Sequence, residues 1–249
     1  MYTEPRSTLA LDDPYLGIWR EGALHRVAIN AAVDGLLTVR SLIEEARTVP
    51  MTALHPILRS IIENASLALY LIEPEDRDQR LLRSFNSMAD DAKRARSFRE
   101  KLGSSGAAEI YDRDIALIDD LLAERAALKH LSARTLALPT YTRLVMDADT
   151  FLLADPALNR ISGFKLIALW QVLSGLSHGR AWAMVEALER SNAVVNEESR
   201  SGTVTATTSV AAVATFMQRG LELVESVIRL YGRRSTADYA LAADIDEPW

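Results

Sequence analysis

A stripe of apolar residues in the first third of the chain constrains the fold most. Between positions 54 and 72 apolar residues recur every three or four positions, so they lie on one side of a helix. They are Leu54, Ile57, Leu58, Ile61, Ile62, Ala65, Ala68, Leu69 and Ile72. A helix with such a stripe gains its stability by packing against other elements. The sequence therefore predicts a helix that forms part of a larger helical core.

Helical patterns, separated by prolines and glycines, cover most of the remaining chain. Asp12 or Asp13 is expected to cap the first helix, with Pro14 in its first turn. Further helices are expected over about 15–48, 75–101, 107–134, 141–154, from about 163, and over about 209–231. These patterns predict an all-α, multi-helix bundle of about seven to eight helices.

The residues near 191–208 carry the clearest strand signal. The β-prone stretch "TVTAT" and the apolar "AVV" flank the polar "NEESRSG", which predicts a small β-hairpin or a loop insertion. The resulting domain layout is an N-terminal arm over 1–13, a single helical domain over 14–232 and an acidic, flexible C-terminal tail over 233–249.

Composition excludes several classes of protein. The 249 residues contain no cysteine and carry a formal charge of −6. The absence of cysteine excludes disulfide frameworks and thiolate metal sites. The negative charge argues against DNA binding and against an anionic membrane surface. The sequence shows neither a leader pattern nor a membrane-spanning run, so a cytoplasmic location is expected.

The chain also lacks the common motifs of metal, nucleotide and hydrolase sites. Its histidines, His25, His55, His130 and His178, are far apart in sequence, and none has a second histidine at metal-ligand spacing. No glycine-rich phosphate loop and no nucleophile elbow is present. We therefore expect neither a metal nor a cofactor.

One polar strip interrupts the apolar helix expected after residue 163. The apolar residues from 164 to 176 cover almost the whole helix circumference, which predicts burial on every side. Gln171, Ser174 and His178 share one face of this helix, with Ser177 adjacent and Gly175 allowing a close backbone approach. Buried polar groups need partners, so this strip is expected to meet polar groups of another helix or to line a ligand pocket.

The helix over 54–72 offers such partners. Arg59, Glu63, Ser66 and Tyr70 form a row opposite its apolar stripe, and we expect Arg59 or Glu63 to meet His178 across a helix pair. Two alternatives remain open. Arg59 and Glu63 are also spaced as an ordinary surface ion pair, and His178 also suits a hydrogen-bonded core or helix-terminal position.

The chain resembles uncharacterised bacterial all-helical proteins related to the HEPN superfamily. The resemblance is carried by Arg59 and Glu63 on an early helix and by Ser174, Ser177 and His178 near the end of a later one. In active HEPN ribonucleases an Arg and a His four to six residues apart cleave RNA, commonly across a dimer interface. Such proteins are often toxins or defence components. Two pairs have this spacing here, Arg20 with His25 and Arg125 with His130. Neither has the polar neighbour usual in active members.

These observations lead to three hypotheses. The first is a binding or interaction protein that holds a small ligand or a protein partner at Arg59, Glu63, Tyr70, Gln171, Ser174, Ser177 and His178. We expect such a protein to form a homodimer through exposed apolar helix faces. The second is a metal-independent ribonuclease, in which His130 or His25 is the general base and the paired Arg stabilises the transition state; only this hypothesis implies RNA. The third is a structural scaffold.

Overall fold

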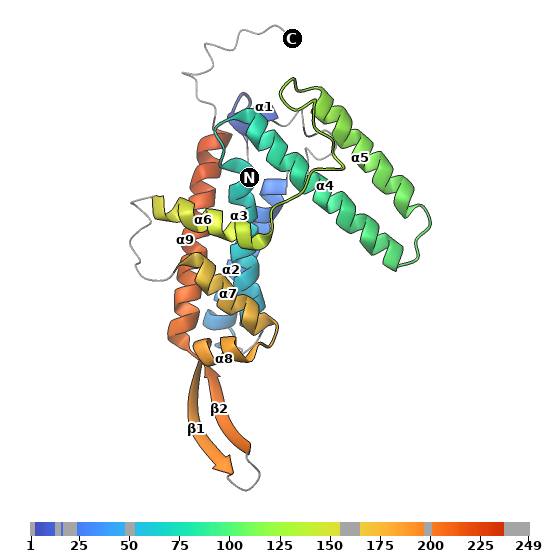
Figure 1. The fold of residues 1–249 in the computed structure, drawn as a ribbon. Coiled ribbons are helices and arrows are strands. Elements are labelled where there is room, and N and C mark those ends of the chain that lie inside the picture. Colours follow the sequence, from blue (N-terminus) through green and yellow to red (C-terminus); the bar gives the residue numbers. More distant parts are fainter. Residues whose placement is uncertain are drawn as a thin grey trace. The chain divides into compact units, whose positions relative to one another are not determined.

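The computed structural model describes residues 3–12, 16, 24–47, 53–154, 165–196 and 201–236. Within these ranges the chain forms nine helices and two strands (Figure 1), and the predicted all-α class is confirmed. In chain order they are α1 (Thr8–Asp12), α2 (Leu24–Glu44), α3 (Leu54–Ile72), α4 (Arg77–Lys101), α5 (Ala107–Ala123), α6 (Tyr141–Ala154), α7 (Leu166–Ser177), α8 (Ala181–Ala187), β1 (Leu188–Asn196), β2 (Ser201–Thr208) and α9 (Val210–Ser235).

The chain divides into two compact units. Unit 1 comprises Met1–Ala28, Leu67–Thr140 and Ile228–Trp249, and unit 2 comprises Ile29–Ser66 and Tyr141–Val227. Helices α2, α3 and α9 contribute residues to both units. The predicted capping residues Asp13 and Pro14, the candidate Arg20 and the tail from residue 237 lie outside the described residues.

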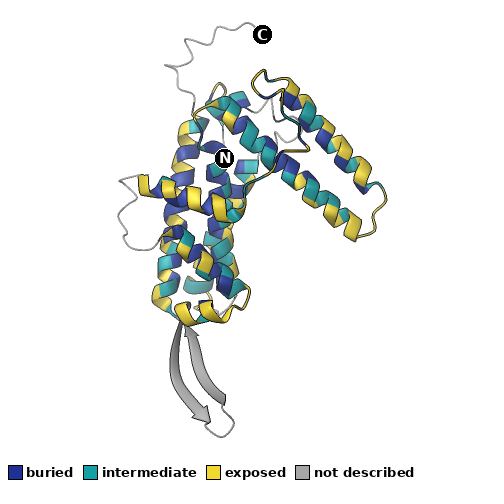
Figure 2. Ribbon diagram, in the orientation of Figure 1, coloured by how far each residue is buried: buried dark blue, intermediate teal, exposed yellow. Residues whose placement is uncertain are grey.

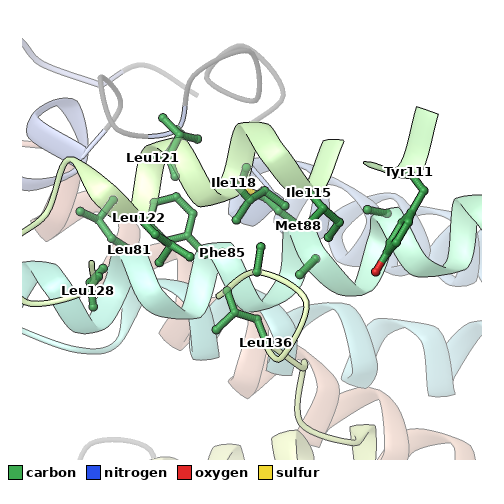
Figure 3. Close-up of a cluster of buried hydrophobic side chains, with 14 residues drawn as sticks. Leu81, Phe85, Met88, Tyr111, Ile115, Ile118, Leu121, Leu122, Leu128 and Leu136 are labelled. Atoms are coloured by element: carbon green, nitrogen blue, oxygen red, sulfur yellow. The ribbon is translucent and has the colours of Figure 1, made fainter. Parts of the chain in front are cut away.

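An antiparallel pair of helices, α4 and α5, supplies most of the core of unit 1. Asp76 caps α4, because its carboxylate accepts the backbone N–H of Gln79 at 2.8 Å. Figure 2 shows that each helix buries one side and exposes the other. The buried sides meet in a hydrophobic cluster (Figure 3), whose labelled members are Leu81, Phe85, Met88, Tyr111, Ile115, Ile118, Leu121, Leu122, Leu128 and Leu136. The α4 members of this cluster recur every three or four positions, so they share one face of the helix.

The end of α5 differs from the sequence prediction. A helix was expected to continue to about residue 134, but α5 ends at Ala123. The following residues fold back in turns, and the Asp119 carboxylate accepts the backbone N–H of Ala133 at 2.7 Å. This return buries Leu128 and Leu136 in the core of unit 1. Burial of these leucines therefore outweighs the local helical preference of the segment.

Arginines stabilise the C-terminal end of α3 and the turn that follows it. The Arg83 guanidinium donates to the carbonyl of Tyr70 at 2.7 Å, and Arg234 donates to the carbonyl of Glu73 at 3.1 Å. Arg80, which is buried, donates to the carbonyl of Pro74 at 3.0 Å. Carbonyls at and just beyond the C-terminal end of a helix need partners from outside it, and arginine side chains supply them here.

Asp12 forms a tertiary ion pair, and the helix that the sequence predicted it to cap would begin among residues outside the described ranges. It is the last residue of α1, and its buried carboxylate accepts two bonds from Arg80, at 2.7 and 3.1 Å. Burial raises the pKa of Asp12, while Arg80 and Arg77 act in the opposite direction. The carboxylate that the sequence analysis expected at a helix cap is therefore bound by a buried guanidinium from α4.

Unit 2 is organised around the first half of α3. Within it the predicted stripe is buried at Leu54, Leu58, Ile61, Ile62 and Ala65. A Cβ on Gly35 of α2 would lie 2.6 Å from Ile61, and one on Gly220 of α9 would lie 3.3 Å from the same side chain. Both neighbouring helices thus approach α3 closely at glycines.

A charged group inside unit 2 positions the start of α7. The Asp149 carboxylate of α6 accepts the backbone N–H of Leu166 at 2.8 Å, and it lies 3.7 Å from the Arg219 guanidinium of α9. Arg219 also donates to Glu222 at 2.8 Å. All three charged side chains are buried, so their mutual pairing offsets much of the cost of removing them from water.

Strands β1 and β2 form an antiparallel ribbon directly after α8. The register pairs Leu188 with Thr208 at the base, Ser191 with Thr205 in the middle and Asn196 with Ser201 at the far end. The pairing shifts between Ser191 and Val194, so β1 contains a bulge. Only Ser209 separates β2 from α9.

Candidate functional site

The end of α7 positions His178. The N–H of Gly179 bonds to the carbonyl of Leu176 at 3.1 Å, and the N–H of Arg180 bonds to the carbonyl of Gly175 at 2.8 Å. Gly179 has a φ of 63°, which glycine adopts without steric cost. This is the Schellman arrangement that ends many helices, and it makes His178 the C-cap of α7.

Arg59 of α3 reaches this histidine. Its Nη1 lies 3.2 Å from Nε2 of His178, and its Nε donates to Oε1 of Glu63 at 2.7 Å. The same Oε1 accepts the indole N–H of Trp170 at 3.0 Å. Arg59, Glu63, Trp170 and His178 are hereafter called the α3–α7 cluster. The predicted meeting of Arg59 with His178 is confirmed as a contact.

The chemistry of the guanidinium fixes the hydrogen-bonding state of His178. A guanidinium has only donors, so Nε2 of His178 must accept the bond from Arg59. A histidine that accepts at Nε2 is neutral and carries its proton on Nδ1. In this arrangement Nδ1 is therefore a hydrogen-bond donor.

Trp170 completes the cluster on its apolar side. It is buried, and the Arg59 guanidinium carbon lies 5.7 Å from the centroid of its ring, within the range of a cation–π interaction. Trp170 was not among the candidate residues predicted from the sequence. The sequence could have indicated this residue, because Trp170 lies four residues before Ser174 and so on the same helix face, and a buried indole N–H requires an acceptor.

The cluster lies partly in contact with solvent. The side chains of Arg59 and Glu63 are 24% and 18% exposed, and His178 is exposed. The sequence predicted that the helix here would be buried on every side, and this prediction is wrong. Helix α7 buries Leu166, Leu169, Trp170, Leu173 and Gly175 but exposes Ala168 and Gln171, because its other face has no covering element among the described residues.

Gly175 has the predicted role of allowing a close approach. A Cβ at this position would lie 2.5 Å from Cβ of Ala183 and 2.9 Å from the ring of Trp182. Helix α8 therefore packs directly on the backbone of α7, one turn before His178.

The remaining predicted binding residues have separate surroundings. Ser177 donates to the carbonyl of Leu173 at 2.8 Å, and Ser174 is half-buried while Gln171 is exposed. Tyr70 belongs to unit 1, where its hydroxyl accepts from Asn86 at 3.3 Å and the Arg83 guanidinium carbon lies 4.7 Å from its ring centroid. A binding role for any of these residues stays a prediction.

Three residues of the ribonuclease hypothesis, His25, Arg125 and His130, are described by the structure and lie in unit 1. His25 is buried, and its ring centroid is 5.8 Å from that of Tyr231. Burial, with a smaller contribution from Arg26, lowers the pKa of His25 to about 4. Arg125 donates to the Asp78 carboxylate at 2.8 Å, whereas His130 is exposed. The ribonuclease hypothesis stays a prediction.

Three further findings concern metal binding, membrane-spanning helices and similarity to known proteins. In the part of the chain that the structure describes, no three histidine or acidic side chains gather as a metal site would require. None of the described helices combines the length and apolar character needed to cross a bilayer. Comparisons with protein families, curated proteins and solved structures found no match for the chain.

Proposed function

We propose that this chain is a binding protein that holds a small ligand bearing a carboxylate or a phosphate group at the α3–α7 cluster. The observation that carries the proposal is the contact between Arg59 and His178. It joins two helices from distant parts of the sequence through donor-rich side chains that still reach solvent.

A second ion pair in the same unit shows why the α3–α7 cluster differs from ordinary surface pairing. Arg40 and Glu44 of α2 have the same spacing and the same 2.7 Å bond as Arg59 and Glu63. The Arg40 and Glu44 side chains are 68% and 59% exposed, so their pairing contributes little. Arg59 is held in addition by Trp170 and His178. A guanidinium fixed in this way loses little further conformational freedom when it binds a ligand.

The remaining N–H donors of Arg59 and His178 indicate which ligand groups the α3–α7 cluster can bind. The bonds of Arg59 to Glu63 and His178 use its Nε and one Nη1 hydrogen, and a guanidinium carries further N–H donors on Nη1 and Nη2. Nδ1 of His178 supplies another donor. Paired donors from arginine suit the oxygens of a carboxylate or a phosphate. The Glu63 carboxylate offsets the charge of Arg59, which favours a small, singly charged group over a polyanion.

Thermal unfolding with defined probes tests this proposal. Inorganic phosphate, acetate, succinate and citrate are titrated separately, so that the carboxylate and phosphate arms are distinguished. A probe at about a hundred times its Kd stabilises a protein by about 2.7 kcal/mol, which corresponds to a rise in Tm of roughly 5–10 °C for a chain of this size.

The matched variants are Arg59→Gln, His178→Gln and the control Arg40→Gln. We expect a probe to raise the Tm of the wild type and of Arg40→Gln equally, and to leave the Tm of Arg59→Gln unchanged. His178→Gln is expected to weaken binding, because it alters the contact with Arg59. Equal stabilisation of Arg59→Gln and the wild type, or no stabilisation by any probe at millimolar concentration, would overturn the proposal.

A further inference from the structure

Trp182 of α8 presents a large apolar ring to solvent. It is 51% exposed, and Val185, three residues later and so on the same side of α8, is 49% exposed. Both residues belong to unit 2, which also contains the α3–α7 cluster. Apolar side chains that gather at the surface often mark a binding site, and their position relative to this cluster indicates what they would bind.

The indole ring of Trp182 lies against the backbone of α7. A Cβ built on Gly175 would be 2.9 Å from Cζ2 of the ring and 3.3 Å from its Cε2. His178 follows Gly175 by three residues, and side chains at this spacing on a helix have Cβ atoms about 5–6 Å apart. By these two distances, the edge of the indole lies within about 9 Å of Cβ of His178.

The order of residues around α7 places His178 between two neighbouring helices. An α-helix turns by about 100° per residue, so His178 lies about 80° and Gly175 about 140° around the axis from Trp170. Trp170 is on the side that meets α3, and Gly175 is on the side that meets α8. The exposed His178 therefore lies between the α3 side, with Arg59, and the α8 side, with Trp182.

We propose that the ligand of the α3–α7 cluster is an aromatic carboxylate, whose ring packs on Trp182 while its carboxylate binds the remaining donors of Arg59 and His178. This inference rests on the function proposed above. A singly charged carboxylate suits the cluster, because Glu63 offsets the charge of Arg59. A flat ring suits the indole, because paired aromatic rings gain stacking or edge-to-face contacts beyond what their buried area supplies.

The packing of Trp182 leaves it available for such a contact. One edge of its ring rests on α7 at Gly175, where no side chain intervenes, and half of the residue remains in water. A ring supported in this way loses little conformational freedom on binding, and covering it removes apolar surface from water. A carboxylate as small as acetate can reach the donors but gains none of this contact. Trp182 is thus expected to determine specificity.

Three matched carboxylates test the inference in a ligand-observed NMR titration of the full chain. Acetate supplies the carboxylate alone, benzoate adds a flat ring, and cyclohexanecarboxylate adds a ring of similar size that is not flat. We expect the Kd of benzoate for the wild type to be about tenfold lower than that of acetate. The Kd of cyclohexanecarboxylate is expected to lie between the two.

Variants at Trp182 assign this preference to its side chain. Trp182→Ala is expected to raise the Kd of benzoate to that of acetate and to leave the Kd of acetate unchanged. Trp182→Phe keeps a flat ring and should retain most of the preference. Phe98→Ala is the matched control, because Phe98 is also strongly exposed, at 63%, but belongs to unit 1. Far-ultraviolet circular dichroism checks that every variant is folded.

The outcomes separate this inference from the proposed function. If no carboxylate binds the wild type, the carboxylate arm of the proposed function fails and this inference fails with it. If acetate binds and Arg59→Gln abolishes its binding, but benzoate binds no more tightly than acetate, the proposed function stands and the inference is overturned. A folded Trp182→Ala that keeps the preference for benzoate, or equal Kd values for benzoate and cyclohexanecarboxylate, would also overturn it.

Discussion

The close packing of α7 and α8 predicts that Gly175→Ala destabilises the protein. The added methyl group would lie 2.5 Å from Cβ of Ala183, whereas two carbon atoms prefer a separation of about 3.5–4.0 Å. Helix α8 must then retreat by about 1 Å. Trp182 is a weaker obstacle, because its exposed side chain can turn away.

The magnitude follows from two opposing effects. Overpacking of this kind costs about 1–3 kcal/mol, and replacing glycine by alanine inside a helix recovers about 0.5–1 kcal/mol. The expected net loss is about 0.5–2 kcal/mol, or a fall in Tm of roughly 1–8 °C for a chain of this length. Urea and thermal unfolding, followed by circular dichroism, measure both quantities.

Two further variants separate packing from helix propensity. Gly232 of α9 has no atom within 4 Å of a built Cβ, so Gly232→Ala should stabilise the protein by about 0.5 kcal/mol. Adding Ala183→Gly to Gly175→Ala removes the opposing methyl group and should restore stability beyond the sum of the single effects. If Gly175→Ala stabilises the protein as Gly232→Ala does, α8 does not contact α7 at this glycine and the reasoning is refuted.

Two predictions concern buried charge in unit 1. In the unfolded chain His25 has its usual pKa of 6.5, whereas in the folded protein its pKa is about 4. Between pH 6.5 and pH 4 unfolding therefore takes up a proton, and the free energy of unfolding falls as the pH is lowered. The loss is about 3 kcal/mol, and His25→Phe should remove this component from the pH profile of urea unfolding; an unchanged profile would contradict it. Arg80→Met should cost about 3–5 kcal/mol, because it leaves the buried carboxylate of Asp12 without its main partner. Adding Asp12→Leu should recover part of this loss in the same unfolding assay, and a double variant less stable than Arg80→Met alone would show that the ion pair is not the cause.

Local sequence determined the helices whose ends and buried faces depend on nearby residues. The stripe of α3 was predicted from spacing alone, because a period of 3.6 residues marks the buried face wherever the partner lies. Helix α6 has the predicted bounds, Tyr141–Ala154, and α4 begins at Arg77, directly after its cap Asp76 and close to the predicted start at about residue 75. The contact of Arg59 with His178 was also predicted, since polar residues on otherwise apolar faces require partners.

Tertiary structure decided which groups satisfy one another. Local sequence marked Asp12 as a candidate helix cap, and only the tertiary structure shows that a buried guanidinium from α4 binds its carboxylate. Helix α5 stops at Ala123 because the residues beyond it are buried against the α4–α5 pair. Trp170 belongs to the α3–α7 cluster because the packing of α3 places Glu63 3.0 Å from its indole nitrogen. Periodicity and capping are local properties of the chain, whereas the partner of a buried donor or acceptor depends on how distant helices pack.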